Sequence, residues 1–343
     1  MALAAVWASA SLMGAVGIYE PSPARIAGIT LDSRRTPPDG MFDELAEFGV
    51  NQVAVVPYAF FRDGSLGFAE NGRWFSESQS GAISLADSLR EHGIGLVLKP
   101  QVWLGRAGFS GDLDFADDAE WSEWEAQYER YILHNAAVAE SAGASWFVVG
   151  TELARFGIER PQFWRQLIAR VRLVYSGPLT YAANWWGEVD SLQFWDDLDA
   201  IGVQAYYPLA EIESPSQEDL KDAWAPHAAQ LQSLSRKWGK PILFTEIGYK
   251  STTDAAIEPW AWTPRPGEAV ADPELQARLY EAFFQGPWTS EWSAGAFIWK
   301  WYAAGSSPRL ALDFSPQGKP AEEILRQAYQ AEARRNQLPG DDR

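Results

Sequence analysis

Eight apolar, strand-like segments alternate with amphipathic helical segments along most of the chain, and this alternation limits the possible folds. The strand-like segments are Ile26–Asp32, Val50–Tyr58, Gly93–Trp103, Ser145–Glu152, Pro178–Trp186, Leu198–Tyr207, Pro241–Tyr249 and Gly295–Tyr302. Such alternation is typical of a parallel sheet whose strands are joined by helical crossovers. Eight repeats predict an α/β fold that closes into a (β/α)8 barrel, a TIM barrel, in a single domain.

Helices are expected between these strands and after the last one. The predicted helices are Met41–Phe48, Ala82–His92, Glu120–Ala142, Pro161–Tyr175, Leu220–Trp238, Pro273–Gln285 and Pro320–Arg335. The pattern is weakest between the fifth and sixth strands, where only Glu188–Asp197 connects them. An open, doubly wound sheet is the alternative fold. No Gly-x-Gly-x-x-Gly motif follows the first strand to support a dinucleotide site, so the closed barrel is favoured.

The chain divides into one large domain and two short terminal segments. We expect the barrel domain to span residues 21–335 and a C-terminal tail to span 336–343. Residues 1–20 form a separate segment, in which residues 2–18 are apolar or small. This segment resembles the apolar region of an export signal, without the positive charge that usually precedes it, and it is also long enough for a short membrane tether. The sequence therefore predicts an exported protein, which is periplasmic, extracellular or membrane-anchored.

Composition restricts the partners and the chemistry. The chain has 28 Lys and Arg against 46 Asp and Glu, a net charge of −18, which argues against nucleic acid or an anionic membrane surface as a partner. The absence of cysteine excludes thiolate nucleophiles and thiolate metal ligands, and three histidines are few for a metal site. The 18 tryptophans fill a core in part, and indole rings also stack on sugars. We expect a neutral glycan partner, no cofactor and no metal, and the oligomeric state stays open.

Two predicted strands end in a glutamate. SWFVVGTEL leads to Glu152 and PILFTEIG contains Glu246. The end of a buried strand is a costly place for an unpaired carboxylate, and an ion pair with Arg155 or Lys250 would explain each one singly. In a barrel, both would project from the carboxyl ends of the strands, where the active sites of such barrels lie. A pair of carboxylates brought together there is what glycoside hydrolysis requires.

Four motifs in order, LKPQVW, VVGTEL, FTEIGYKSTTDAAIEPW and FIWKWY, give the chain a family resemblance. Over residues 26–330 it resembles the retaining glycosidases of clan A, and within them glycoside hydrolase family 113, which includes β-mannan hydrolases. The resemblance implies that Glu152 is the acid/base, Glu246 the nucleophile, and Tyr206 the hydroxyl that hydrogen-bonds the nucleophile. It also implies that Trp299 or Trp301 forms the floor of the subsite at the cleaved bond.

Other residues are candidates for contacts with substrate. Thr151 stands where most of the clan has the asparagine that holds the sugar 2-hydroxyl, and Gln101 stands where a histidine is expected. Strand alternation puts Lys99, Gln101 and Trp103 on one face, although an ion pair with a core carboxylate explains Lys99 equally well. Further candidates are Asn184 and Trp185 at the end of the fifth strand, Trp260 and Trp262 in the irregular segment Ser251–Asp272, and Arg34 as a support for the nucleophile.

These observations predict a retaining β-glycoside hydrolase that acts on a neutral polysaccharide or oligosaccharide by double displacement. The family resemblance implies a β-mannan substrate first and a β-glucan second. Two neighbouring carboxyls do not both ionise easily, so the pKa of one of them, that of Glu152, is expected to be raised. The alternatives are a non-catalytic glycan-binding barrel and a transglycosylase in an exopolysaccharide system.

Overall fold

The structure is a computed structural model, and it describes residues 24–33, 36–68, 75, 78–105, 108–262, 267, 269–303 and 310–337. The predicted export segment, most of the predicted tail and Arg34 lie outside the described residues. No helix in the described part of the chain is long and apolar enough to cross a membrane.

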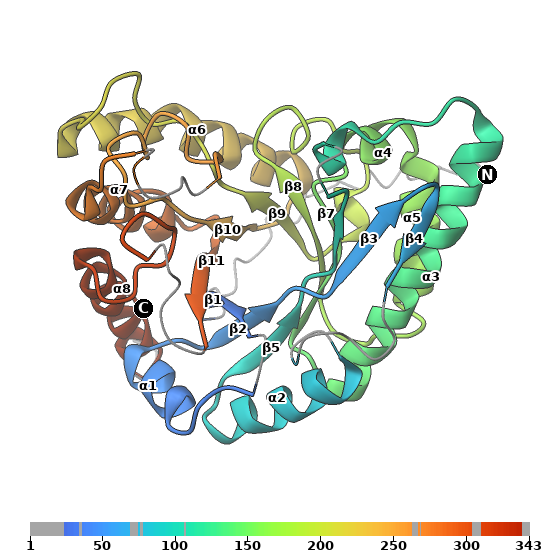
Figure 1. The fold of residues 1–343 in the computed structure, drawn as a ribbon, viewed down its shortest axis with the longest axis horizontal. Coiled ribbons are helices and arrows are strands. Elements are labelled where there is room, and N and C mark those ends of the chain that lie inside the picture. Colours follow the sequence, from blue (N-terminus) through green and yellow to red (C-terminus); the bar gives the residue numbers. More distant parts are fainter. Residues whose placement is uncertain are drawn as a thin grey trace, which may run out of the picture.

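Eight parallel strands close into a barrel, in the order β1-β11-β10-β9-β8-β7-β5-β2 (Figure 1). The strands are β1 (Ile26–Asp32), β2 (Gln52–Val55), β5 (Gly95–Leu98), β7 (Trp146–Thr151), β8 (Leu179–Asn184), β9 (Ala200–Gln204), β10 (Ile242–Ile247) and β11 (Ser293–Tyr302). The predicted (β/α)8 barrel is confirmed. Because all eight strands run parallel, the residues that follow the fourth and seventh strands lie at the same end of the barrel.

Helices surround the barrel (Figure 1). They are α1 (Met41–Phe48), α2 (Gln79–Glu91), α3 (Asp118–Ala142), α4 (Ala154–Glu159), α5 (Pro161–Val171), α6 (Gln217–Trp238), α7 (Pro273–Gln285) and α8 (Pro320–Gln337), with 3-10 turns η2 (Ser110–Asp112), η3 (Trp195–Asp197) and η4 (Pro287–Thr289). The short connection between β8 and β9, where the sequence pattern was weakest, holds η3 and no α-helix. The helix α4 was not predicted, and α8 continues two residues past its predicted end.

Capping residues explain where the long helices begin and end. Helix α6 starts earlier than predicted because Ser216 and Asp219 form a capping box, in which the serine hydroxyl accepts the Asp219 amide. Helix α3 starts at an aspartate cap, Asp117, which accepts two amides of the first turn. Gly143 and Gly239 end these two helices with φ of +63°, a conformation that glycine adopts without a steric cost.

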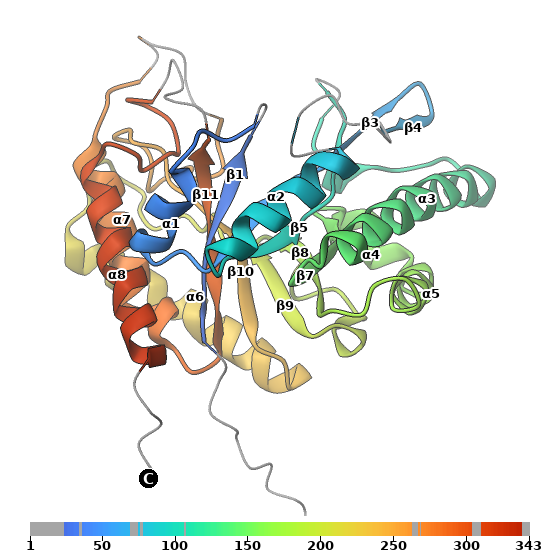
Figure 2. The same ribbon diagram turned by 90° about the horizontal axis from the view of Figure 1, so that it is seen from below.

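The second and third predicted strands are each divided in two. The residues after β2 form β3 (Tyr58–Arg62), which pairs with β4 (Ser65–Gly67), and the residues after β5 form β6 (Gln101–Trp103). Pro57 and Pro100 stand at the two breaks, where a residue without an N–H cannot continue the ladder. The resulting three-stranded sheet, β4-β3-β6, rises at the carboxyl ends of the barrel strands (Figure 2).

One buried residue from each barrel strand fills the inside of the barrel: Ile26, Ala54, Val97, Val148, Ala182, Ala200, Leu243 and Phe297. Phe297 needs the space that Gly28 leaves free, since a Cβ at Gly28 would lie 2.4 Å from its ring. A second, larger cluster packs the helices against the outside of the barrel. These layers hold the strands, and therefore the residues at their ends, in fixed positions.

Candidate active site

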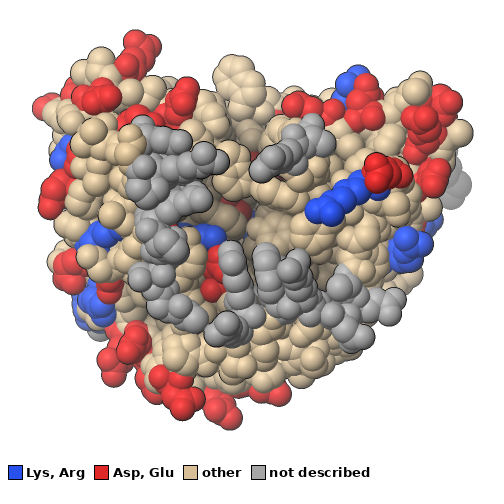
Figure 3. All heavy atoms as spheres, viewed as in Figure 1, with Lys and Arg blue, Asp and Glu red and all other residues tan. Residues whose placement is uncertain are grey.

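Glu152 and Glu246 lie at the carboxyl ends of the barrel strands. Glu152 follows β7, the fourth strand of the barrel in chain order, and Glu246 is the penultimate residue of β10, the seventh. Figure 1 looks onto this end, and in the space-filling view the face is hollowed near its centre (Figure 3). The alternation of strands and helices thus brings two glutamates that are far apart in the sequence to one site.

Both carboxylate oxygens of Glu246 are engaged. Lys99 Nζ pairs with Oε1, and the Tyr206 hydroxyl donates to Oε2 at 2.6 Å. All three side chains are buried, and Lys99 reaches across the barrel, since β5 and β10 lie on opposite sides of it. Burial and the charge of Glu246 raise the pKa of Tyr206 well above its usual value, so the hydroxyl keeps its proton. Glu246 is therefore held in one orientation by two donors.

Glu152 has a different environment. Asn184 Nδ2 donates to its Oε1 at 2.9 Å, and its backbone has a φ of +49° in the left-handed region. Burial, and after it the negative charge of Glu246, raises the pKa of Glu152, while Lys99 and the Asn184 hydrogen bond oppose the rise; the resulting pKa is about 7. Glu152 therefore holds its proton in acidic solution, and the two glutamates are close enough to interact electrostatically.

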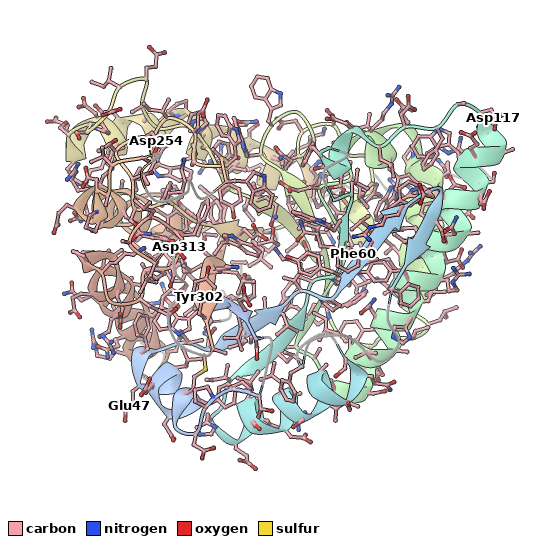
Figure 4. All side chains as sticks on the ribbon, in the orientation of Figure 1. Glu47, Phe60, Asp117, Asp254, Tyr302 and Asp313 are labelled. Carbon is pink, nitrogen blue, oxygen red and sulfur yellow. The ribbon has the colours of Figure 1, made fainter. Side chains whose placement is uncertain are left out.

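The two ion pairs that could have explained the glutamates singly do not form. Arg155 pairs with Asp114 at 2.7 Å and with Glu159 at 2.9 Å. Lys250 pairs with Asp254, which is labelled in Figure 4, at 3.1 Å. The sequence allowed two roles for Lys99, a sugar contact or an ion-pair partner, and the structure shows an ion pair with Glu246.

Trp299 and Trp301 point to opposite sides of β11. The register of β1 against β11 shifts between Ile29, which faces Ile298, and Leu31, which faces Trp301, so β11 carries one extra residue there. The Trp299 ring lies 5.3 Å from Lys99 Nζ at the site. The Trp301 ring is buried against Phe48 of α1, at 5.4 Å between ring centres. Trp301 is therefore a core residue, and its prediction as a substrate contact was wrong.

Two other candidates differ from their predicted roles. Thr151 is 1% exposed and its hydroxyl donates to the Pro100 carbonyl at 3.1 Å, so it ties β7 to the end of β5 instead of facing the site. Lys99 does not share a strand face with Gln101 and Trp103, because Pro100 separates it from β6. Gln101 and Trp103 stand opposite Tyr58 and Phe60 of β3, on one face of the small sheet.

Tryptophan rings gather around the site. The Trp185 ring lies 5.6 Å from Trp260, and the Trp103 ring lies 5.5 Å from Trp262. Trp260 is 49% exposed, Trp262 is 78% exposed, and Trp186, which the sequence reading missed, is 75% exposed. The segment after β10 thus carries exposed indoles to the ends of β8 and β6.

Two buried residues behind Glu152 were also missed. Glu188 Oε2 accepts the Asn184 amide N–H at 2.6 Å, and Glu188 Oε1 pairs with the Tyr181 hydroxyl. Nothing in the sequence marked them, because Glu188 stood at the start of the expected connection between the fifth and sixth strands and Tyr181 inside an expected strand. Among the residues that the structure describes, no group of three or more His, Asp or Glu could hold a metal ion.

A barrel of eight parallel strands, with two electrostatically coupled glutamates at the ends of the fourth and seventh and exposed tryptophans around them, has the architecture of a glycoside hydrolase. The sequence model of Glycoside Hydrolase Family 113 matches residues 40–313. The chain belongs to this family.

Solved structures of the family resemble the chain over most of its length. A family 113 β-mannanase from Alicyclobacillus acidocaldarius, solved in complex with ManMIm, is 26% identical with a TM-score of 0.78, covering 90% of this chain and 98% of that one. A complex of a family 113 β-1,4-mannanase is 25% identical with a TM-score of 0.75, covering 90% and 100%. The β-glucuronidase of Ruminococcus gnavus, 14% identical with a TM-score of 0.60 over 90% of this chain and 50% of that one, shares the fold. None of the curated proteins compared with the chain matches it.

Proposed function

We propose that the protein is a retaining β-glycoside hydrolase that cleaves a neutral β-linked chain, a β-mannan in the first place and a β-glucan in the second. The observation that carries the proposal is the contrast between the two glutamates. Glu246 is fixed by two donors, whereas burial and the charge of Glu246 raise the pKa of Glu152 to about 7. A carboxyl that keeps its proton beside one that is held by donors is the pair that acid-assisted double displacement uses.

In this mechanism Glu246 attacks the anomeric carbon while Glu152 gives its proton to the glycosidic oxygen, so one C–O bond forms and another breaks. The attack consumes the charge of Glu246, which removes one cause of the raised pKa of Glu152. Glu152 then accepts a proton from water as the water attacks the glycosyl-enzyme. The same charge coupling thus favours the acid in the first step and the base in the second.

Lys99 and Tyr206 act on the nucleophile in both directions. They hold the Glu246 oxygens for the attack, and they stabilise the carboxylate that leaves when the glycosyl-enzyme breaks down. Because the Tyr206 hydroxyl keeps its proton, it remains a donor in both steps.

Charge pairing of three lysines at the mouth of the barrel, among the residues that the structure describes, supports a neutral substrate. Lys99 pairs with Glu246, Lys250 with Asp254, and Lys300 with Asp32 at 2.6 Å. A uronic acid would need a cation that a carboxylate of the protein does not already neutralise. Exposed Trp186, Trp260 and Trp262 instead offer apolar ring faces for sugars. We also propose that the enzyme is exported, on the basis of residues 2–18.

A panel of aryl β-glycosides and β-linked polysaccharides tests this proposal. We expect turnover of β-mannan or β-mannosides, with β-glucans second, and NMR of the first products should show the β-anomer before mutarotation. First products with the α-anomer would contradict the retaining mechanism. Binding to polysaccharide without turnover of any member of the panel would favour the non-catalytic barrel. Transfer to a high concentration of added sugar, detected by mass spectrometry, would identify a transglycosylase.

A further inference from the structure

We propose that Glu188 is a positioning residue for Glu152: its two carboxyl oxygens hold the acid/base glutamate through its side chain and through its backbone. The inference rests on the proposed function, because it assigns Glu188 a part in the work of the acid/base. Glu188 follows β8 and does not face substrate, since its side chain is 0% exposed. Its effect on the reaction therefore passes through the residues that it contacts.

The first contact path leads to the Glu152 carboxyl. Glu188 Oε2 accepts the backbone N–H of Asn184 at 2.6 Å, which fixes the place of that residue at the end of β8. The Asn184 Oδ1 accepts the N–H of Trp186 at 2.8 Å. This bond decides which way the amide faces, because it leaves the Nδ2 group to donate to Glu152 Oε1 at 2.9 Å. The direction of the acid/base carboxyl thus depends on the anchoring of Asn184.

The second contact path leads to the Glu152 backbone. Glu188 Oε1 pairs with the Tyr181 hydroxyl, which also accepts the backbone N–H of Leu153 at 2.8 Å. Leu153 directly follows Glu152, whose φ of +49° is costly for a residue other than glycine and needs support from its surroundings. Tyr181 is itself fixed in β8, with its ring 5.0 Å from Trp164. Both oxygens of the buried Glu188 carboxyl are therefore connected to Glu152 by hydrogen bonds, one to its side chain and the other to its backbone.

The surroundings of Glu188 are those of a neutral carboxyl. It is faced by Tyr181 from β8, by Glu152 from the end of β7, by Tyr128 from α3, and by Gly157 of α4, where a Cβ would lie 3.9 Å from Glu188 Oε1. No ion pair in the described part of the chain includes Glu188. Burial is the main cause that raises its pKa, the bonds from Tyr181 and Asn184 oppose the rise, and the charge of Glu152 adds to it; the resulting pKa is about 8. The anchor is therefore the same throughout acidic and neutral solution.

The test compares the wild type with Glu188→Leu, a variant that fills the space but has neither oxygen, on two aryl glycosides of the preferred sugar. Leucine is used because glutamine could keep both bonds of a neutral carboxyl, its C=O accepting from Asn184 and its NH2 donating to Tyr181. Release of phenol needs a proton from the acid, whereas release of 2,4-dinitrophenol does not. We expect kcat/KM on the phenyl glycoside to fall by about 10- to 100-fold, because a misplaced Glu152 loses part of the rate enhancement that general acid catalysis supplies. On the dinitrophenyl glycoside, which needs no acid, kcat/KM should fall by less than about 3-fold. Equal losses on both substrates, in a variant that melts as a folded protein, would overturn the proposal.

A matched control separates positioning from the general effect of losing a buried carboxyl. Glu332 is 5% exposed and pairs with Arg25, which precedes β1 at the amino-terminal end of the barrel. Glu332→Leu should leave the ratio of the two kcat/KM values at the wild-type figure. If Glu188→Leu does not fold, Tyr181→Phe removes only the hydroxyl of the second path and should change the ratio in the same direction. A wild-type ratio in Tyr181→Phe would then count against the proposal.

A titration without turnover keeps this inference separate from the proposed function. The Glu152 carboxyl is followed by NMR of 13C-labelled glutamate and assigned with Glu152→Gln. Because the Asn184 bond lowers the pKa of Glu152, displacement of Asn184 in Glu188→Leu should raise that pKa. An unchanged pKa would overturn the role of Glu188 even in an active enzyme. A wild type that turns over neither glycoside would overturn the proposed function, and the pKa shift would still test the anchor.

Discussion

At the scale of single residues, two glutamates of the same chemical type receive different environments. Glu246 accepts from Lys99 and Tyr206, whereas Glu152 has one amide donor and a backbone in the left-handed region. The difference depends on Lys99 and Asn184, which come from other strands. This is why the sequence could identify both glutamates from their position at strand ends but could not show that Lys99, instead of Lys250, is the ion-pair partner.

The raised pKa of Glu152 predicts the pH dependence of the reaction. Glu152 must be protonated to release the leaving group, so kcat/KM should fall as the pH rises through about 7. With Glu152→Gln and a dinitrophenyl glycoside, which needs no acid, this alkaline limb should disappear. Pre-steady-state release of dinitrophenol across a pH series measures the limb. Its survival unchanged in the variant would show that another group is the acid.

At the scale of single elements, β11 shows how one extra residue changes the roles of its neighbours. Trp299 and Trp301 would share a face of a regular strand, and the register shift turns one to the site and the other to the core. Alternation in the sequence cannot reveal a bulge, because a bulge is defined by the partner strand. The prolines at the ends of β2 and β5 were visible in the sequence, but the small sheet that they produce depends on pairing between β3 and β6.

The bulge predicts a division of effects between the two tryptophans. Trp301→Ala should lower the free energy of unfolding by about 3–5 kcal/mol, the usual cost of removing a buried indole, with kcat/KM little changed. Trp299→Ala should reduce kcat/KM by about 10-fold or more and change stability less, because its ring lies beside the Lys99–Glu246 pair. Urea unfolding and steady-state kinetics on both variants measure this. Similar losses of activity in the two would contradict it.

The segment Ser251–Asp272 should contribute to binding of the chain rather than to bond cleavage. Its exposed Trp260 and Trp262 offer ring faces and no titratable group. Replacing both by Ala should raise KM for long substrates by about 10-fold, corresponding to about 1.4 kcal/mol, and leave short aryl glycosides almost unchanged. Kinetics on a series of oligosaccharides of increasing length measures the difference. Equal losses at every length would mean that the segment shapes the catalytic centre.

At the scale of the whole molecule, the strand and helix pattern was sufficient to predict the barrel, and the barrel placed Glu152 and Glu246 at one end. The pattern could not reveal the buried layer behind the site, because Glu188 and Tyr181 acquire their roles only when β8 packs beside β7. Most of the core is hydrophobic, and Glu188 and Glu246 are buried carboxyls close to the active site.

Those buried carboxyls should affect stability as a function of pH. The pKa of Glu188 rises from 4.5 to about 8 on folding, so the folded state holds an extra proton between these values. The stability from this group is complete below pH 4.5 and is lost as the pH rises through about 8, a total of about 5 kcal/mol. Urea unfolding at a series of pH values should show Glu188→Gln gaining stability relative to the wild type over this range. A constant difference would contradict the raised pKa.

The central claim is the division of work between Glu246 and Glu152, and chemical rescue with azide tests it most directly. Without the nucleophile, in Glu246→Ala, azide attacks an activated aryl β-glycoside from the open side and the product is the α-glycosyl azide. Without the acid/base, in Glu152→Ala, azide attacks the glycosyl-enzyme and the product is the β-glycosyl azide. NMR of the two products gives the anomers. The account predicts α from Glu246→Ala and β from Glu152→Ala, and the reverse pair would exchange the two roles and contradict it.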